Sequence, residues 1–140
     1  MSERKADPVH GPTNPLRPPD GVLRLGSLIA LRPDMEQQYR ALHADVWPEV
    51  LEALKRANVR NYNIFVADID GQKLLFSFFE YHGSDFAADM GRIAADAMTR
   101  KWWELTGPCQ SRLPGVSADQ QWLPLESVFS ALAYSGDAGR

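Results

Sequence analysis

Residues 61–81 read NYNIFVADIDGQKLLFSFFEY, and this stretch predicts a β-hairpin at the centre of the fold. Aromatic and β-branched side chains, which favour strands, fill both arms, NYNIFVA at 61–67 and KLLFSFFEY at 73–81. Between the arms, Asp70-Gly71 is a strong hairpin signal because these residues tolerate the positive φ angles of a two-residue turn. We therefore expect two adjacent antiparallel strands.

Helices are expected on both sides of the hairpin. The first runs from a cap at Asp34 to about residue 58, and its apolar side chains repeat at the helical period. The second runs from a cap at Ser84 to the Trp102-Trp103 pair, and Gly107-Pro108 ends it. The inward stripe of the first helix is expected to hold Tyr39, Leu42, His43, Trp47, Val50, Leu51 and Leu54.

Two further strands complete the expected order. Val22 to Leu31 is dominated by apolar residues, and Trp122 to Leu132 offers a last strand that Pro124 interrupts, which suits an edge position. The order β-α-β-β-α-β is that of a ferredoxin-like α+β domain, an antiparallel sheet with helices on one face. Because Leu74 to Phe79 is apolar at nearly every position, we infer that a second subunit covers the other face.

The length and composition of the chain predict one globular domain. Its 140 residues include 44% apolar and 24% charged residues, which is typical of such domains. Residues 1–20 contain five of the ten prolines and almost no large apolar side chain, so we expect a disordered or loosely packed extension before a single domain at 21–140.

Several classes of partner and site are disfavoured by composition. The net charge of −3, without a basic stripe, argues against nucleic acid, and no apolar run is long enough to span a membrane. The single cysteine, Cys109, excludes an intramolecular disulfide and fits a reducing cytoplasm. The three histidines are remote from one another, so no metal site is expected, and no nucleotide-binding glycine motif occurs.

His43 is the first candidate for chemistry. It follows Tyr39 and precedes Trp47 at i, i+4 steps, so the three side chains share one helical face. Two interpretations stay open: His43 is a core imidazole bonded to a backbone carbonyl, or it is an acid/base group that titrates near neutrality, with Tyr39 holding the substrate or relaying its proton.

Trp102-Trp103 is the second candidate. Adjacent helical residues point about 100° apart, so both indoles cannot occupy the centre of one apolar face. Either one fills the core and the other covers a helix end or a dimer seam, or the flat indoles stack on sugar rings. If the indoles line a sugar-binding cavity, Tyr62 could add a phenol to it.

These motifs, taken together, resemble the L-rhamnose mutarotase family. The resemblance rests on YRALHADVWPEV at 39–50, NYNIF at 61–65, RKWWEL at 100–105 and ESVFS at 126–130. It implies a dimeric α/β barrel without metal or organic cofactor that interconverts the α and β anomers of L-rhamnose or a related 6-deoxy sugar. GPCQSRLPG at 107–115 and the long extension before Val22 depart from the usual pattern.

The resemblance also implies roles for individual residues. His43 is the catalytic residue, and Tyr39, Tyr62, Trp102 and Trp103 contact the sugar. His43 would exchange a proton with the ring or anomeric oxygen, with Tyr39 or a water completing the path. Two other functions compete with this one: a non-catalytic barrel that binds ligands or regulates, and a barrel monooxygenase acting on an aromatic substrate.

Overall fold

The central hairpin forms as predicted in the computed structural model, which describes residues 20–131. Strand β2 (Val59–Ile69) pairs antiparallel with β3 (Gln72–Tyr81). Asp70 and Gly71 connect them with φ angles of 55° and 82°, the two positive values that a type I′ turn requires. The Gly71 N–H donates to the Asp68 carboxylate at 3.1 Å, so this acidic residue stabilises the turn.

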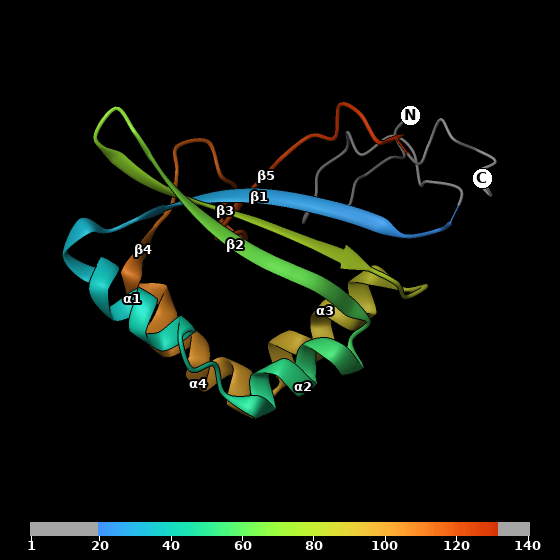
Figure 1. The fold of residues 1–140 in the computed structure, drawn as a ribbon. Helices are drawn as coiled ribbons and strands as arrows, with labels where there is room; N and C mark the ends of the chain where they lie inside the picture. The colour runs from blue at the N-terminus through green and yellow to red at the C-terminus, as the bar shows by residue number, and fades with distance from the viewer. Residues whose placement is uncertain (1–19, 132–140) are drawn as a thin grey trace.

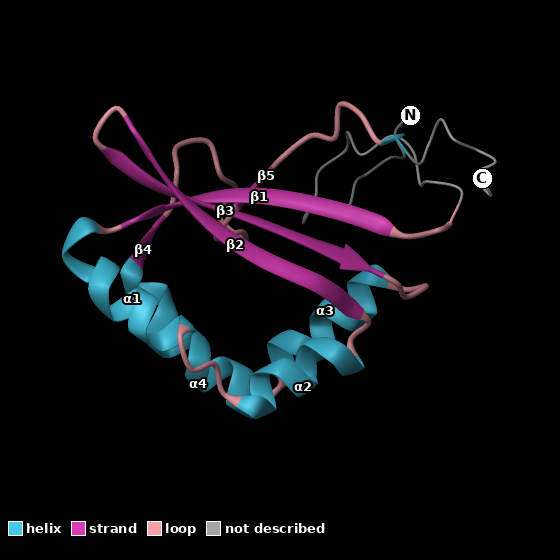
Figure 2. Ribbon diagram, viewed as in Figure 1, coloured by secondary structure: helices cyan, strands magenta, loops and turns pink. Residues whose placement is uncertain are grey.

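The sheet has the ferredoxin-like order. Strand β1 (Leu23–Leu31) pairs antiparallel with β3 on one side and with β4 (Gln110–Ser111) on the other, giving β2-β3-β1-β4 (Figure 1). Strand β5 (Leu123–Pro124) also pairs with β1. All helices lie on one face of this curled sheet, as Figure 2 shows. The predicted α+β architecture is confirmed.

The predicted last strand is wrong in extent. Trp122 to Leu132 was expected to be one strand, but only the two residues of β5 pair, and Leu132 lies outside the described residues. Pro124 has no N–H to donate, and beyond it one backbone bond, from Leu125 N to Gly26 O at 2.9 Å, continues the contact with β1. The two-residue β4 is too short to produce a periodic pattern and was not predicted.

Each predicted helix is divided in two. A short 3₁₀ turn, η1 (Pro33–Met35), precedes α1 (Glu36–His43) and α2 (Pro48–Arg56). After the hairpin come α3 (Phe86–Ala95), α4 (Ala97–Thr106) and the 3₁₀ turn η2 (Gly107–Cys109), so Gly107-Pro108 ends the second helical region as expected.

The divisions have local causes. Trp47 is extended, as the residue before a proline prefers, and Pro48 occupies the first position of α2, where its missing N–H costs nothing. At the second division Asp96 is extended and caps α4, because its carboxylate accepts hydrogen bonds from the Thr99 N–H and hydroxyl, both at 2.9 Å. A continuous helix from 84 to 103 was therefore the wrong expectation.

Two predicted helix caps are also wrong. Asp34 lies inside η1 and no side-chain hydrogen bond caps that turn or α1. Asp85, not Ser84, caps α3, since its carboxylate accepts a hydrogen bond from the Ala88 N–H at 3.2 Å. Of the residues expected to face inward from α2, Val50 is buried and Leu54 is half-buried, and Leu51, although exposed, lines the space between the helices and the sheet with them.

The predicted extension at 1–20 lies outside the described residues except for Asp20, whose carboxylate accepts a hydrogen bond from the Val22 N–H at 3.0 Å. Within the described residues, no helix has the length and apolar character needed to cross a membrane.

A buried carboxylate ties α3 to the sheet. Asp89 on α3 accepts hydrogen bonds from the Tyr81 hydroxyl at 2.5 Å, from Asn58 Nδ2 at 3.0 Å and from Arg92. These donors, Tyr81 first, lower the pKa of Asp89 to about 2. Burial raises the pKa of Tyr81 to about 12, so the phenol stays a donor. The network joins the end of β3 to the residue before β2.

Replacing Asp89 is expected to weaken the fold. Asp89→Asn places an amide group against donors that need an acceptor, so the free energy of unfolding should fall by about 1–3 kcal/mol in urea titrations near pH 7. Asp45→Asn, at an exposed site between α1 and α2, is the matched control and should change little.

The pH dependence follows from the lowered pKa. The native carboxylate has a pKa of about 2 against an ordinary value of 3.8, so its contribution is complete above 3.8 and is lost as the pH falls towards 2. The stability difference between the natural protein and Asp89→Asn should therefore shrink across that interval. A difference that stays constant on acidification would contradict this account.

Candidate active site

A cavity of about 1070 Å³ lies between the sheet and the helices. Residues of β1, β2 and β3 form its sheet wall, and residues of α1, α2, α3 and α4 form the opposite wall. The size is that of a site for a small organic molecule. All five predicted site residues line this cavity, namely Tyr39, His43, Tyr62, Trp102 and Trp103.

His43 is held in one tautomer by the helix that carries it. It is the last residue of α1, and its Nδ1 lies 2.8 Å from the backbone carbonyl oxygen of Tyr39. A carbonyl only accepts hydrogen bonds, so Nδ1 carries the proton of the neutral ring. Nε2 is then an unprotonated acceptor, and within residues 20–131 nothing hydrogen-bonds to it.

Aromatic rings surround this imidazole. The centroids of the Tyr39 and His43 rings are 4.2 Å apart, and the two ring planes are inclined by 32°. The indole of Trp102 meets the imidazole edge-on, with the ring centroids 5.3 Å apart. Trp47 packs against Trp102 in the same manner, also at 5.3 Å, and is not part of the cavity wall. These rings leave the imidazole little freedom to turn. His43 is therefore a packed imidazole bonded to a backbone carbonyl, as the first interpretation expects, and it also faces the cavity, as the second requires.

The two tyrosines are neutral hydrogen-bond donors. Burial raises the pKa of Tyr39 to about 12, although a hydrogen bond from Gln110 Nε2 at 3.4 Å opposes the shift. Tyr62 is exposed to the cavity, yet the protein around its phenol raises that pKa to about 12 as well, and Tyr39 adds to the shift. Neither phenol ionises near neutral pH, so both can donate a hydrogen bond to a ligand in the cavity.

The tryptophan pair divides as its spacing predicts. Trp102 is 6% exposed and packs on His43, whereas Trp103 is 46% exposed. Both contribute to the cavity wall, Trp102 as a buried side chain and Trp103 as an exposed one. The apolar face of a ligand ring could therefore stack on either indole.

The cavity also contains residues that the sequence did not single out. Gln110 on β4 touches Tyr39, and Ser27 on β1 and Ser77 on β3 are hydroxyls on the sheet wall. The two serines could have been noticed because they occupy inward positions of otherwise apolar strands. Gln110 gives no such signal, since it lies in a two-residue strand.

Cys109 and His82 could also carry chemistry, but they lie outside the cavity wall. In the described part of the chain, no cluster of three or more histidine, cysteine or acidic side chains could hold a metal ion. Cys109 is fully buried, and burial raises the pKa of its thiol. His82 follows β3, where its Nε2 lies 3.0 Å from Glu80 Oε1.

Fold and cavity define a class of protein: a ferredoxin-like domain with a largely apolar, aromatic pocket that also contains one imidazole and neutral hydroxyl donors. The sequence profile of the L-rhamnose mutarotase family matches residues 24–131. The chain belongs to the L-rhamnose mutarotase family.

Individual relatives are consistent with this membership. An L-rhamnose mutarotase from Paraburkholderia xenovorans is 35% identical over 101 residues, which are 72% of this chain and 88% of the relative. One from Lactiplantibacillus plantarum is 33% identical over 87 residues, covering 62% and 79% of the two chains. The crystal structure of an L-rhamnose mutarotase from Formosa agariphila, 29% identical, superimposes with a TM-score of 0.58 over 77% of this chain and 97% of that one.

The tautomer of His43 can be measured directly. In long-range ¹H–¹⁵N spectra at a pH where the ring is neutral, His43 should show a protonated Nδ1 and an unprotonated Nε2, because Nδ1 donates to the Tyr39 carbonyl. His82 is the internal control with the opposite pattern, since its Nε2 donates to the Glu80 carboxylate. A protonated Nε2 on neutral His43 would show that this assignment is wrong.

Proposed function

We propose that this protein is an L-rhamnose mutarotase that interconverts the α and β anomers of L-rhamnose or a related 6-deoxy sugar in carbohydrate catabolism. The observation that carries the proposal is the free Nε2 of His43 in a cavity lined by phenols and indoles. Family membership supports the same reaction. A ligand-binding module or a monooxygenase has no comparable support.

The reaction needs one proton removed and one supplied. The base takes the proton of the anomeric hydroxyl while the ring oxygen gains one, the bond between the anomeric carbon and the ring oxygen breaks, and an open-chain aldehyde forms. After rotation about the adjacent carbon–carbon bond, the hydroxyl formed from the ring oxygen attacks the other face of the carbonyl. Both protons return, so the two anomers differ only in configuration.

The residues suit these two tasks. His43 Nε2 is the proposed acceptor for the anomeric proton, and the imidazolium that results can return it on ring closure. Tyr39 and Tyr62, with pKa values of about 12, are proposed as sugar contacts that donate hydrogen bonds, and Tyr39 or a water supplies the ring-oxygen proton. Trp102 and Trp103 would pack against the C–H face of the sugar ring and against its methyl group.

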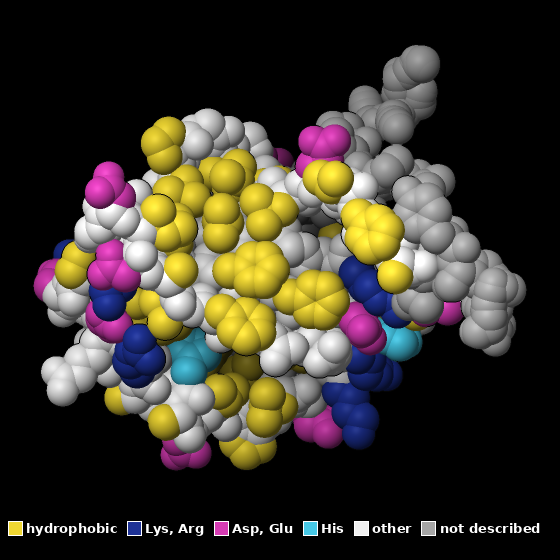
Figure 3. All heavy atoms as spheres, turned by 45° about the horizontal axis from the view of Figure 1, so that its top comes forward, with side chains coloured by type: hydrophobic (Ala, Val, Ile, Leu, Met, Phe, Trp, Pro, Cys, Tyr) yellow, Lys and Arg dark blue, Asp and Glu magenta, His cyan; other side chains and the backbone are white. Residues whose placement is uncertain are grey.

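A homodimer belongs to the proposal. On the face of the sheet away from the helices, the outward side chains of β2 and β3 form the outer apolar face, with Phe65 and Ile69 each 56% exposed and Phe65 stacked on Phe76. Figure 3 shows hydrophobic side chains gathered there. Packing two such sheets together would close a barrel and remove these rings from water.

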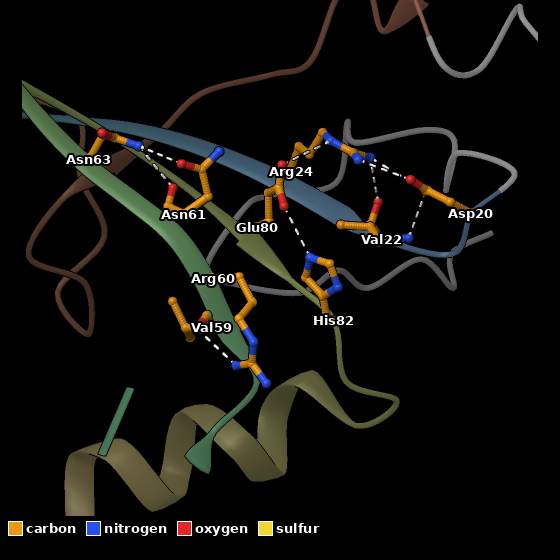
Figure 4. A network of polar contacts seen from close by, with 9 residues as sticks. All are labelled: Asp20, Val22, Arg24, Val59, Arg60, Asn61, Asn63, Glu80 and His82. Carbon is orange, nitrogen blue, oxygen red and sulfur yellow. Dashed lines mark hydrogen bonds and ion pairs between the residues drawn. The ribbon is translucent and has the colours of Figure 1, made fainter. Parts of the chain in front are cut away.

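Charged residues border the outer apolar face at one end. Arg24 lies 2.9 Å from the Asp20 carboxylate and 3.7 Å from that of Glu80, which His82 also contacts (Figure 4). A polar rim beside an apolar centre is the usual anatomy of an interface.

We also propose that residues 21–140 form one domain and that the protein is cytoplasmic. The unpaired Cys109 favours the cytoplasmic location.

Removing the imidazole tests the proposed chemistry. His43→Asn should slow anomer exchange of L-rhamnose, measured by saturation-transfer NMR, by about 10²- to 10⁴-fold, the usual contribution of general acid–base catalysis. His82→Asn, which removes a histidine outside the cavity, is the control and should keep the rate. Undiminished exchange in folded His43→Asn would refute the assignment, and sugar binding without any exchange in the natural protein would favour a binding module.

The oligomeric state tests the outer apolar face. In sedimentation equilibrium the natural protein should have twice the mass of one chain, and Phe65→Glu should have the mass of one, because a charge would be buried without a partner. Leu105→Glu makes the same change at an exposed site on α4 and should remain dimeric. A natural protein with the mass of one chain would rule out the dimer.

A further inference from the structure

Two hydroxyl groups lie side by side in the sheet wall of the cavity. Ser27 of β1 and Ser77 of β3 are direct partners in the antiparallel register, and their Oγ atoms are 2.6 Å apart. Ser77 is 3% exposed and Ser27 is half-buried, and both line the cavity. We refer to them as the serine pair.

The surroundings of the serine pair are apolar. Ser77 is flanked by Ile64 on β2, and the next inward positions along the two central strands carry hydrocarbon side chains. These are Leu25 and Ile29 on β1 and Leu75 and Phe79 on β3. Polar groups placed in such a wall therefore require their own hydrogen-bonding partners.

The pair cannot satisfy itself. Each hydroxyl has one proton and two lone pairs, and the bond between them uses one proton and one lone pair. One proton is left, and within residues 20–131 no other group accepts it from either serine. A hydroxyl proton without an acceptor is costly in this apolar wall, and because both serines line the cavity, the serine pair is suited to a ligand oxygen there.

The position of the serine pair indicates which part of a bound sugar it can meet. His43 belongs to α1 on the helical wall, whereas the serine pair belongs to the sheet on the opposite wall. Because α1 lies across from the sheet (Figure 1), a sugar whose anomeric hydroxyl meets His43 would turn another part of its ring to the sheet. Serine is also small, which leaves room for a ring hydroxyl to reach it.

We infer that the serine pair binds one ring hydroxyl of the sugar other than the anomeric hydroxyl and thereby helps to decide which sugar the enzyme accepts. This inference rests on the proposed mutarotase function. One serine donates to that oxygen, and a lone pair of the other can accept the proton of the same hydroxyl. A sugar lacking the hydroxyl would leave the proton of the pair without an acceptor, so the pocket would reject it.

The test compares L-rhamnose with its 2-deoxy, 3-deoxy and 4-deoxy analogues. Ser77→Ala and the double variant Ser27→Ala/Ser77→Ala should raise KM for L-rhamnose about two- to tenfold, the worth of one hydrogen bond, with kcat nearly unchanged. One of the three deoxy sugars should bind the natural protein and the variants equally, because it has already lost the contact.

Controls separate this role from a structural one. Ser77→Cys nearly preserves the side-chain volume but has only a weak donor, so it should behave like Ser77→Ala. Ser111→Ala removes an exposed hydroxyl from β4 outside the cavity and should change nothing. The inference is overturned if Ser77→Ala affects all four sugars equally or affects none of them.

Binding measured by tryptophan fluorescence distinguishes this inference from the proposed function. If the natural protein binds L-rhamnose without exchanging its anomers, and Ser77→Ala weakens that binding for all but one of the four sugars, the serine pair keeps its role and the mutarotase proposal fails. If none of the four sugars binds, both are overturned.

Discussion

The antiparallel register of β1 on β3 is the constraint on which the rest of the structure depends. From Leu23 opposite Tyr81 to Ala30 opposite Leu74, this pairing decides which side chains point to the helices and which point away. A shift of one residue would exchange the two faces completely. In the observed register Ile29 and Leu75 enter the core, Phe76 and Phe78 point outward, and Ser27 meets Ser77 in the cavity wall.

The helical layer then completes the cavity by being interrupted. If α1 and α2 formed one straight helix, its apolar stripe would continue along the sheet without a break. Pro48 instead restarts the helix, so α1 ends at His43 and Trp47 turns to pack on Trp102. The imidazole is left at a helix end beside a cavity, with its Nδ1 fixed by a carbonyl of its own helix.

Much of the site was predictable because its side chains are unusual for their positions. A histidine on an inward helical stripe and adjacent tryptophans are rare enough to be noticed, and the structure brings both to one cavity with Tyr39 and Tyr62. Gln110 was missed because it gives no signal in the sequence, and the serine pair was missed because a single inward serine in an apolar strand does not reveal its partner. They acquire significance only from partners that are far away along the chain, 71 residues for Gln110 and Tyr39 and 50 residues for the two serines.

The sequence by itself determined the order of strands and helices, the central hairpin and the candidate acid/base group, since these depend on local preferences and on side chains that are conspicuous where they stand. Only the tertiary structure decided where the helices break, which residue caps α3, the length of the last strand and the tautomer of His43. Those features depend on hydrogen bonds whose geometry is set by the folded backbone, such as the bonds from Thr99 to Asp96 and from His43 to the Tyr39 carbonyl. Periodicity records which face a side chain prefers, but it does not record which atom will lie within reach of another.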